Sequence, residues 1–206
     1  TGFDVDLGNA ICAKLKAKCV WVENSFDGMI PALKAKKFDG ILSSMTVTDE
    51  RAKQILFSSK IYNTPTRMVA KKGSPLLPTP TSLKGKRVGV QQGTIQETYA
   101  KTYWAPKGVS VVPYPTQDLI YQDMMSGRLD VTLQDAIMVD GAFLKQPKGK
   151  NFSFAGGNVV DVKTLGVGAA IGLRKEDADL KANIDKALAA IIADGTYKTR
   201  EKILLF

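Results

Sequence analysis

Patterns typical of helices and of strands alternate along this 206-residue chain, and this alternation constrains the fold more than any other feature. Residues 4–18 carry apolar side chains near helical spacing, and residues 19–23 form a short run typical of a strand. Residues 26–36 again predict a helix, and residues 38–42 predict a strand. Strands that alternate with helices predict a parallel or mixed sheet in an α/β fold.

A proline-rich stretch separates this first series from a second one. Residues 73–82 hold three prolines and predict a stiff connecting loop after a strand at 68–72. The second series comprises strands at 87–91, 109–113 and 129–133, and helices at 93–103, 117–126 and 135–144. A strand at 166–173 and a periodic helix at 175–193 follow it. Two α/β series joined by a stiff crossover predict two lobes.

Charge and hydropathy exclude several classes of protein. The chain has 29 Lys and Arg against 20 Asp and Glu, a net charge of +9. The basic residues are scattered, without a stripe of basic and aromatic side chains, so we expect no nucleic acid partner. No apolar run reaches the roughly 20 residues that span a bilayer. We find no signal-peptide pattern and expect any targeting segment to lie outside this sequence.

The two cysteines, Cys12 and Cys19, leave two interpretations open. A zinc site needs about four ligands, and the chain has no His, so we expect no metal site and no cofactor. Their spacing also differs from the Cys-x-x-Cys of redox enzymes. A short local disulfide, which we favour, would place the protein in an oxidising compartment, whereas two buried thiols remain the alternative.

Three predicted strand ends carry polar residues, and in open α/β sheets ligands bind at the carboxyl ends of strands. Ser43–Arg51 offers hydroxyl groups and a guanidinium whose planar fork matches a carboxylate. Gly93–Glu97 opens a helix, where Thr94 and Glu97 predict a capping box and the N–H groups suit an anion. Leu133–Asp135 ends in an acid that suits a cation.

Each strand end also has a plain structural interpretation. Taken alone, Arg51 is more readily a surface arginine that follows the helix N-cap Thr48, and Asp135 is as readily a cap of its own helix. Taken together, the three strand ends supply groups for a carboxylate and an acid for an ammonium. This combination is the chemistry that a zwitterionic amino acid requires.

Long stretches of the chain resemble a known family. The resemblance is carried by GFDVDLGNAIC (2–12), FDGMIPALKAKKFDGILSSMTVTDER (26–51), GVQQGTIQETYA (89–100), DLIYQDMMSGRLDVTLQD (118–135), GAFLKQP (141–147) and GLRKEDADLK (172–181). They are similar to the periplasmic lysine/arginine/ornithine- and histidine-binding proteins of ATP-driven amino-acid import.

The resemblance implies the type II periplasmic-binding fold, in which two α/β lobes joined by a hinge close around one ligand. Residues 1–63 and 168–206 would form lobe one, and residues 64–167 would form lobe two. The hinge crossovers would lie near 63–67 and 160–168. The resemblance also implies the local disulfide between Cys12 and Cys19.

The resemblance assigns the ligand's head group to residues of both lobes. Arg51 would bind the α-carboxylate, and Thr94 would donate to it. Asp135 would take the α-ammonium group. Ser44 and Thr46 would hydrogen-bond the head group.

The ligand's side chain would meet a second set of residues. Phe26 would stack on the aliphatic stem, and Asp4 would help to neutralise a basic side chain. Ser43 and Gln91 would line the side-chain pocket. Ile95 stands where relatives commonly carry a hydroxyl, so one side-chain donor is lost there, at a cost of about 1.5–3 kcal/mol.

The chain departs from the family ahead of its Gly2-Phe3-Asp4 motif. Relatives carry a further stretch there, which contributes the first strand of lobe one, an aromatic lid and an acid. We expect this strand to be missing from the sequence, which would then be a fragment or a truncated form. A lobe that lacks an inner strand exposes unpaired edges and apolar surface.

The resemblance implies a periplasmic solute-binding protein rather than an enzyme. We expect it to capture Arg, Lys, ornithine or His as a monomer and to deliver the amino acid to the membrane permease of an ABC importer. One alternative is a truncated form with impaired binding, and another is the ligand-sensing lobe of a receptor. A remote alternative is a dehydratase-like enzyme on the same fold, which would need an added acid–base residue in a chain without His.

Overall fold

The protein divides into two compact units in a computed structural model that describes residues 2–201. Unit 1 takes in Thr1–Asn24, Gly28–Asn63 and Val167–Phe206, and unit 2 takes in Ser25–Asp27 and Thr64–Gly166. Residues 202–206, part of the range predicted for lobe one, lie outside the described residues. Helices and strands alternate along both units, which confirms the predicted α/β class.

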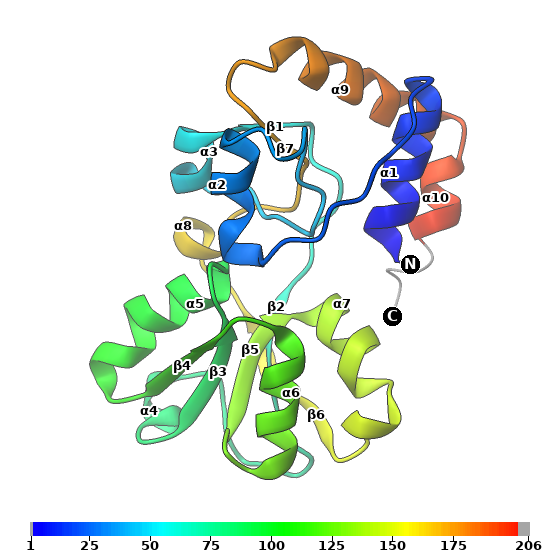
Figure 1. The fold of residues 1–206 in the computed structure, drawn as a ribbon. Helices are drawn as coiled ribbons and strands as arrows, with labels where there is room; N and C mark the ends of the chain where they lie inside the picture. Colours follow the sequence, from blue (N-terminus) through cyan, green and yellow to red (C-terminus); the bar gives the residue numbers. More distant parts are fainter. Residues whose placement is uncertain (1, 202–206) are drawn as a thin grey trace. The chain divides into compact units, whose positions relative to one another are not determined.

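Three helices of unit 1 lie side by side (Figure 1): α1 (Phe3–Lys14), α9 (Ala178–Ala193) and α10 (Thr196–Glu201). Leu7 and Ile11 of α1 are buried with Ile184 and Leu188 of α9 in one apolar cluster. These side chains recur at helical spacing, so each helix buries one face. Unit 1 also contains α2 (Met29–Lys34), α3 (Asp49–Gln54) and β1 (Leu56–Phe57), which pairs antiparallel with β7 (Gly172–Leu173).

Two strands predicted for unit 1 do not form among the described residues. The predicted strand at 19–23 has no regular structure, and that at 38–42 keeps only an isolated bridge between Ile41 and Gly172. A strand exists only where a neighbour takes up its backbone N–H and C=O groups. Both predictions were therefore wrong because the pattern of side chains cannot supply a partner.

Unit 2 is built on one mixed sheet of five strands in the order β4-β3-β5-β2-β6. β3 runs parallel to β4 and β5, and β2 runs antiparallel to β5 and β6. The strands are β2 (Thr66–Lys71), β3 (Arg87–Gln91), β4 (Ser110–Tyr114), β5 (Val131–Asp135) and β6 (Phe152–Val159). The sequence prediction missed β6, because its two central glycines, Gly156 and Gly157, are typical of a loop.

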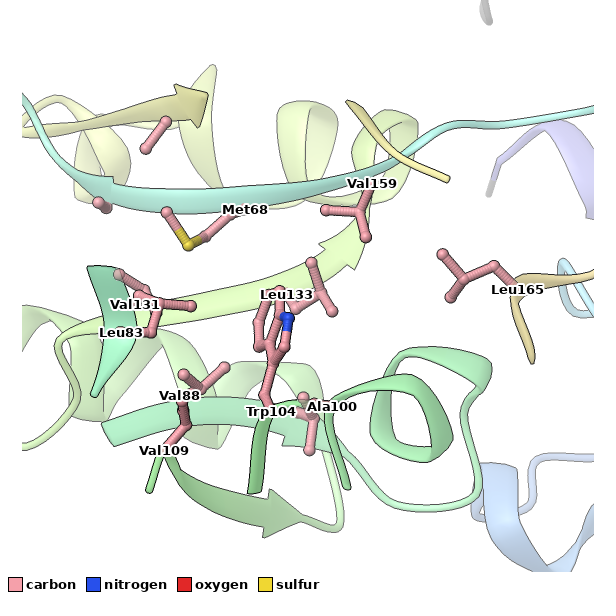
Figure 2. Close-up of a cluster of buried hydrophobic side chains, with 13 residues drawn as sticks. Met68, Leu83, Val88, Ala100, Trp104, Val109, Val131, Leu133, Val159 and Leu165 are labelled. Atoms are coloured by element: carbon pink, nitrogen blue, oxygen red, sulfur yellow. The ribbon is translucent and has the colours of Figure 1, made fainter. Parts of the chain in front are cut away.

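Both faces of this sheet are buried, because alternate residues of a strand point to opposite sides. On one face, Met68 and Leu133 pack with Trp104 and Ala100 (Figure 2). On the other face, Val69 packs with residues of α6 (Gln117–Ser126) and with Phe143.

The remaining helices of unit 2 are short: α4 (Pro80–Leu83), α5 (Ile95–Tyr99), α7 (Ala136–Val139) and α8 (Val162–Leu165). Two of them continue as π-helical turns, α5 through Ala100–Trp104 and α7 through Asp140–Leu144.

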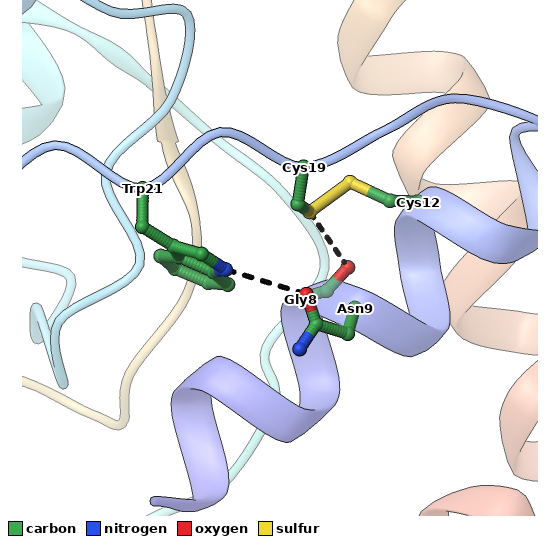
Figure 3. The surroundings of a disulfide bond; sticks show 5 residues. All are labelled: Gly8, Asn9, Cys12, Cys19 and Trp21. Atoms are coloured by element: carbon green, nitrogen blue, oxygen red, sulfur yellow. Dashed lines mark hydrogen bonds between the residues drawn. A yellow bond between two sulfur atoms is a disulfide. The ribbon is translucent and has the colours of Figure 1, made fainter. Parts of the chain in front are cut away.

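A disulfide ties the end of α1 to the segment that follows it (Figure 3). Cys12 and Cys19 are bonded with their Cα atoms 5.8 Å apart, which confirms the predicted pairing. Closing so short a loop stabilises the fold by roughly 2–3 kcal/mol. The ring nitrogen Nε1 of Trp21 also donates to Oδ1 of Asn9 at 3.3 Å. The bond and the ring together hold residues 19–21 against α1.

Residues 2–201 contain neither a candidate membrane span nor a cluster of metal ligands. No helix in this range combines the length and the apolar character that crossing a membrane requires. The same range holds no group of three or more Cys, Asp or Glu side chains arranged to ligate a metal ion.

Candidate ligand-binding residues

Asp4 of unit 1 accepts hydrogen bonds from Ser44 and Tyr62, which come from two other segments of the unit. Its Oδ2 accepts the backbone N–H of Ser44 at 2.7 Å, and its Oδ1 accepts the hydroxyl of Tyr62 at 2.7 Å. The Ser44 and Tyr62 hydroxyls are themselves 2.7 Å apart. Ser44 adopts a φ of 48°, in the left-handed region that side chains rarely occupy. The carboxylate of Asp4 therefore holds Ser44 in a strained conformation, which is typical of ligand sites.

The same contacts set the charge of Asp4. Burial raises the pKa of this carboxyl above its ordinary value, and the hydrogen bonds from Tyr62 and Ser44 only partly oppose that rise. Burial disfavours the ionised form because it removes water from around the charge. Asp4 is thus a half-buried acid that two neighbouring groups already hold in place.

Arg51 lies in the first turn of α3, close to the backbone of the hydroxyl-rich segment. Thr48 caps this helix, as predicted, because its Oγ1 accepts the backbone N–H of Arg51 at 3.3 Å. The side chain turns back, and Nη1 donates to the carbonyl oxygen of Thr46 at 2.8 Å. Burial lowers the pKa of Arg51 to about 10. Arg51 is therefore a positioned, partly desolvated cation, not the surface arginine that composition alone suggests.

In unit 2, the loop after β3 is fixed by hydrogen bonds around Thr94. Thr94 caps α5, because its Oγ1 accepts the backbone N–H of Glu97 at 3.1 Å. The same hydroxyl donates to the carbonyl oxygen of Gln91 at 2.7 Å, so donation to a ligand requires it to rotate. In the predicted capping box, the carboxylate of Glu97 would accept the backbone N–H of Thr94. It accepts the backbone N–H of Gly93 instead, at 2.7 Å.

Gln91 and Ile95, two further predicted ligand residues near Thr94, have different surroundings. The amide of Gln91 donates to the carbonyl oxygen of Pro115 at 3.3 Å and accepts from Gln117 at 3.1 Å. Ile95 packs against the buried cluster on one face of the sheet. Gln91 therefore presents an oriented amide at the strand end, whereas Ile95 contributes to the core.

Asp135 ends β5 and caps α7. Its Oδ1 accepts the backbone N–H of Met138 at 3.0 Å, and its Oδ2 accepts the hydroxyl of Thr64. Each carboxylate oxygen has two lone pairs, so both contacts leave acceptor capacity for an ammonium group. Asp135 can therefore cap α7 and still accept a hydrogen bond from an ammonium group.

The segment Ser25–Asp27 lies against the loop after β3, and this contact positions Phe26. Gly93 has a φ of 75°, and a Cβ added to it would lie 2.7 Å from the Cα of Asp27. Phe26 begins the single turn Phe26–Gly28 and is half-buried. The glycine at position 93 is thus required both by the backbone conformation and by the approach of this segment.

The predicted residues fall into separate groups. In unit 1, Asp4, Ser44, Thr46 and Arg51 gather at the segment 44–51, whereas Ser43 lines a groove on the side of α1. In unit 2, the predicted residues are Phe26, Gln91, Thr94, Ile95 and Asp135, which lie at two strand ends and the adjoining turn.

The sequence prediction missed Tyr62 and Thr64, which hold the two acids. Tyr62 donates to Asp4, and Thr64 donates to Asp135. Both residues lie in the irregular stretch before β2, outside every strand end and every helix cap. No spacing or motif in the sequence indicated them, because their roles depend on contacts 58 and 71 residues away along the chain.

Comparison of the sequence with known families and proteins gives consistent matches. Residues 1–203 match the family of bacterial extracellular solute-binding proteins, family 3. The lysine/arginine/ornithine-binding periplasmic protein of Escherichia coli is 53% identical over 98% of this chain and 77% of its own length. The histidine-binding periplasmic protein of E. coli is 48% identical over the same shares. The L-arginine-binding protein of Pseudomonas aeruginosa is 45% identical over 96% of this chain and 76% of its own.

Solved structures agree with this picture. An ancestral arginine-binding protein bound to arginine has a TM-score of 0.90 and 35% identity, over 98% of this chain and 87% of that one. A periplasmic binding protein of Salmonella typhimurium, described for its high arginine specificity, has a TM-score of 0.91 and 29% identity, over 98% and 88%. The fold expected from the resemblance, of the type II periplasmic-binding class, is confirmed by these likenesses.

Proposed function

Because the chain belongs to family 3 of the bacterial extracellular solute-binding proteins, we propose that it captures a free basic amino acid in the periplasm. Arg, Lys, ornithine and His are the proposed ligands, since three relatives at 45–53% identity are named for binding them. The protein would act by binding and not by catalysis, as its relatives do. It would hand its ligand to the membrane permease of an ABC importer.

The observation that carries this proposal is the environment of Arg51. Its guanidinium is partly desolvated, with a pKa lowered to about 10, and lies next to the hydroxyl-rich segment 43–48. A positioned, poorly solvated guanidinium is a strong receptor for a carboxylate, because a charge-assisted pair regains the solvation that burial removed.

The remaining residues have proposed roles that follow from their chemistry. Asp135 would accept the α-ammonium group, and the hydroxyl or backbone N–H of Thr94 would add a donor for the carboxylate. Ser44 and Thr46 would contribute hydrogen bonds to the head group. A ligand must also satisfy its own basic side chain, because an unpaired charge taken out of water is costly.

Asp4 is proposed to provide that negative charge, with Gln91 and Ser43 as further polar groups and Phe26 as an apolar surface for the ligand's stem. Tyr62 would act through Asp4, because its hydroxyl fixes the position of one carboxylate oxygen. Ile95 offers only its backbone N–H in the loop where a hydroxyl side chain would add a donor.

Equilibrium dialysis against labelled arginine tests the proposal. We expect saturable binding at one site, displaced by unlabelled lysine, ornithine and histidine in an order that the assay will define. Leucine and glutamate should not displace the label, because neither carries a cationic side chain. Equal displacement by leucine would contradict the choice of ligand, and a folded chain without binding would favour the alternative of a truncated form with an impaired site.

A further inference from the structure

One end of the sheet in unit 2 gathers lysines that lie far apart in the sequence. Strands β3, β4, β5 and β6 begin at this end, and β2 ends there, because β2 runs antiparallel to its two neighbours. The candidate ligand residues Gln91 and Asp135 end β3 and β5, so they lie at the opposite edge of the sheet. The six lysines at or next to the first edge are called the lysine end: Lys71, Lys72, Lys84, Lys86, Lys107 and Lys150.

Backbone pairing brings three of these lysines together at β2 and β6. Lys71 is the last residue of β2 and pairs with Phe152, the first residue of β6. The backbone N–H of Lys72 donates to the carbonyl oxygen of Asn151 at 2.9 Å, and Lys150 precedes that asparagine. Residues about 80 positions apart in the chain are therefore neighbours at this corner of the sheet.

The other three lysines meet where β3 and β4 begin. A backbone N–H···O bond of 2.8 Å joins Gly85 to Gly108, and the lysines flank these two glycines. Lys84 and Lys86 lie on either side of Gly85, and Lys107 precedes Gly108. A Cβ on Gly108 would lie 3.4 Å from Cγ of Lys84, so the two turns are in contact.

The positive charge of the lysine end is not compensated by neighbouring acids. The aspartates next to it are engaged by arginines, since Asp130 pairs with Arg87 at 3.2 Å and Asp123 pairs with Arg128 at 2.6 Å. Among the described residues, no ion pair joins any of the six lysines to a carboxylate. Three lysines elsewhere in unit 2 do pair with acids, at 2.7–3.2 Å. The fold thus concentrates unpaired cations at one edge.

We propose that the lysine end binds an anionic lipid surface through contacts between its ammonium groups and headgroup phosphates. Five strands spaced about 4.8 Å apart give this edge a width of roughly 20 Å, which spans several headgroups. Lysine binds phosphate as a point charge and needs no fixed geometry, which suits a surface whose charges are mobile. Each lysine held near an anionic membrane strengthens the attraction by roughly fivefold.

The composition of this edge favours a lipid surface over an acidic protein. Protein interfaces are depleted in lysine and depend on aromatic and arginine anchors. In the described part of unit 2, the exposed large apolar side chains include no aromatic ring, and both arginines at this edge already hold aspartates. A pocket for one free anion would need buried, convergent donors, whereas five of the six lysines are exposed.

Lipid binding at this edge would leave the candidate ligand residues of unit 2 accessible, because they lie at the other ends of the strands. No helix of residues 2–201 can cross a membrane, so the association would be peripheral and sensitive to salt. It requires no amino acid, and it is therefore independent of the proposed function.

Cosedimentation of the full chain with lipid vesicles tests the proposal. We expect binding to vesicles of equal parts phosphatidylglycerol and phosphatidylcholine at an ionic strength of about 0.01 M, where the Debye length of about 30 Å exceeds the width of the lysine end. Binding should weaken by at least roughly tenfold at about 0.15 M, where that length is about 8 Å. Vesicles of phosphatidylcholine alone should not bind.

Two triple variants remove the same charge from different places. The first replaces three residues of the lysine end: Lys71→Gln, Lys72→Gln and Lys107→Gln. The matched control replaces three exposed lysines of unit 1: Lys34→Gln, Lys36→Gln and Lys186→Gln. At low salt the first should bind the anionic vesicles at least roughly tenfold more weakly than the wild type, and the control should stay within about twofold. Circular dichroism establishes that both variants are folded.

Three outcomes would overturn the proposal. The first is no binding of the wild type to the anionic vesicles at low salt, and the second is an equal loss in the two triple variants, which would show an effect of net charge alone. The third is binding to polyglutamate but not to the vesicles, which would indicate an acidic protein partner. Arginine titration of the same samples reports on the proposed function separately, since none of these outcomes depends on amino-acid binding.

Discussion

At the scale of single residues, Arg51 and Asp4 are each held by hydrogen bonds to neighbouring residues of unit 1. Arg51 donates to the carbonyl oxygen of Thr46, and Asp4 accepts from Ser44 and Tyr62. These contacts fix the position of each charge before any ligand arrives. A receptor organised in this way loses less entropy on binding than one that must order its side chains.

Replacing Arg51 with lysine should weaken arginine binding by about one to two orders of magnitude. Lysine keeps the charge but loses the planar fork, and a charge-assisted hydrogen bond contributes about 1.5–3 kcal/mol. Dialysis of Arg51→Lys would measure the loss. Lys53→Ala is the matched control, because Lys53 lies on the same helix and pairs with Glu50 at the surface. Equal effects of both substitutions would contradict the assignment.

Asp4 should make the stability of unit 1 depend on pH. Its pKa is raised in the folded state, so the folded protein holds this proton more tightly than the unfolded chain does. The contribution of Asp4 to stability should therefore rise as the pH falls through the raised pKa, and should level off below the ordinary value of 3.8. Urea unfolding between pH 7 and pH 3.5 gives the unfolding free energy of the wild type minus that of Asp4→Asn, and this quantity should increase as the pH falls. A decrease on acidification would contradict the expectation.

At the scale of elements, the ends of strands and helices position the candidate ligand-binding residues of unit 2. In unit 2, β3 ends at Gln91, and the positive φ of Gly93 turns the chain into α5. The same glycine leaves room for Asp27, next to Phe26. One residue thus positions both the loop after β3 and the segment that carries the aromatic ring.

Gly93→Ala should destabilise unit 2 more than Gly127→Ala does. Both glycines have a φ near 75°, so both substitutions carry the same backbone penalty of about 1–2 kcal/mol. A Cβ at position 93 would also meet the backbone of Asp27 at 2.7 Å, whereas position 127 has open space. Urea unfolding of the two variants separates the contact from the backbone effect. Equal losses of stability would show that the Asp27 contact is unimportant.

Much of the element pattern follows from the sequence, and the exceptions have a common cause. The bounds of β3 and α6 agree with the prediction at 87–91 and 117–126, because local periodicity determines them. Residues 19–23 and 38–42 have the composition of strands but lack ladders, because pairing depends on a distant partner. The same limit applies to the site: Asp135 ends β5 and Arg51 follows the helix cap Thr48, both of which local sequence indicates. Tyr62 and Thr64 act through long-range contacts.

At the scale of the whole molecule, the net charge opposes the proposed ligand. The chain carries a net charge of +9, and arginine, lysine and ornithine each carry about one net positive charge at pH 7. Long-range attraction from the net charge therefore does not bring the ligand in, and under the proposal short-range contacts with acidic side chains supply the favourable interaction. Selectivity would then come from short-range contacts that salt screens little.

The rate of arginine association should accordingly stay constant or rise with salt. Raising the ionic strength from about 0.01 to 0.15 M shortens the Debye length from about 30 to 8 Å and screens the repulsion between ligand and protein. Stopped-flow measurement in sodium chloride, repeated in potassium chloride, gives the rate constants. A rate constant that falls steeply with salt would indicate attractive steering and contradict this expectation.

Isothermal titration of the folded chain with arginine at pH 7 tests the central claim most directly. We predict one saturable site whose binding heat disappears in Arg51→Ala and persists in Lys53→Ala. Circular dichroism on the same samples establishes that each variant is folded. Undiminished binding by a folded Arg51→Ala variant, or no binding by the folded wild type, would contradict the claim that Arg51 binds the carboxylate of a basic amino acid.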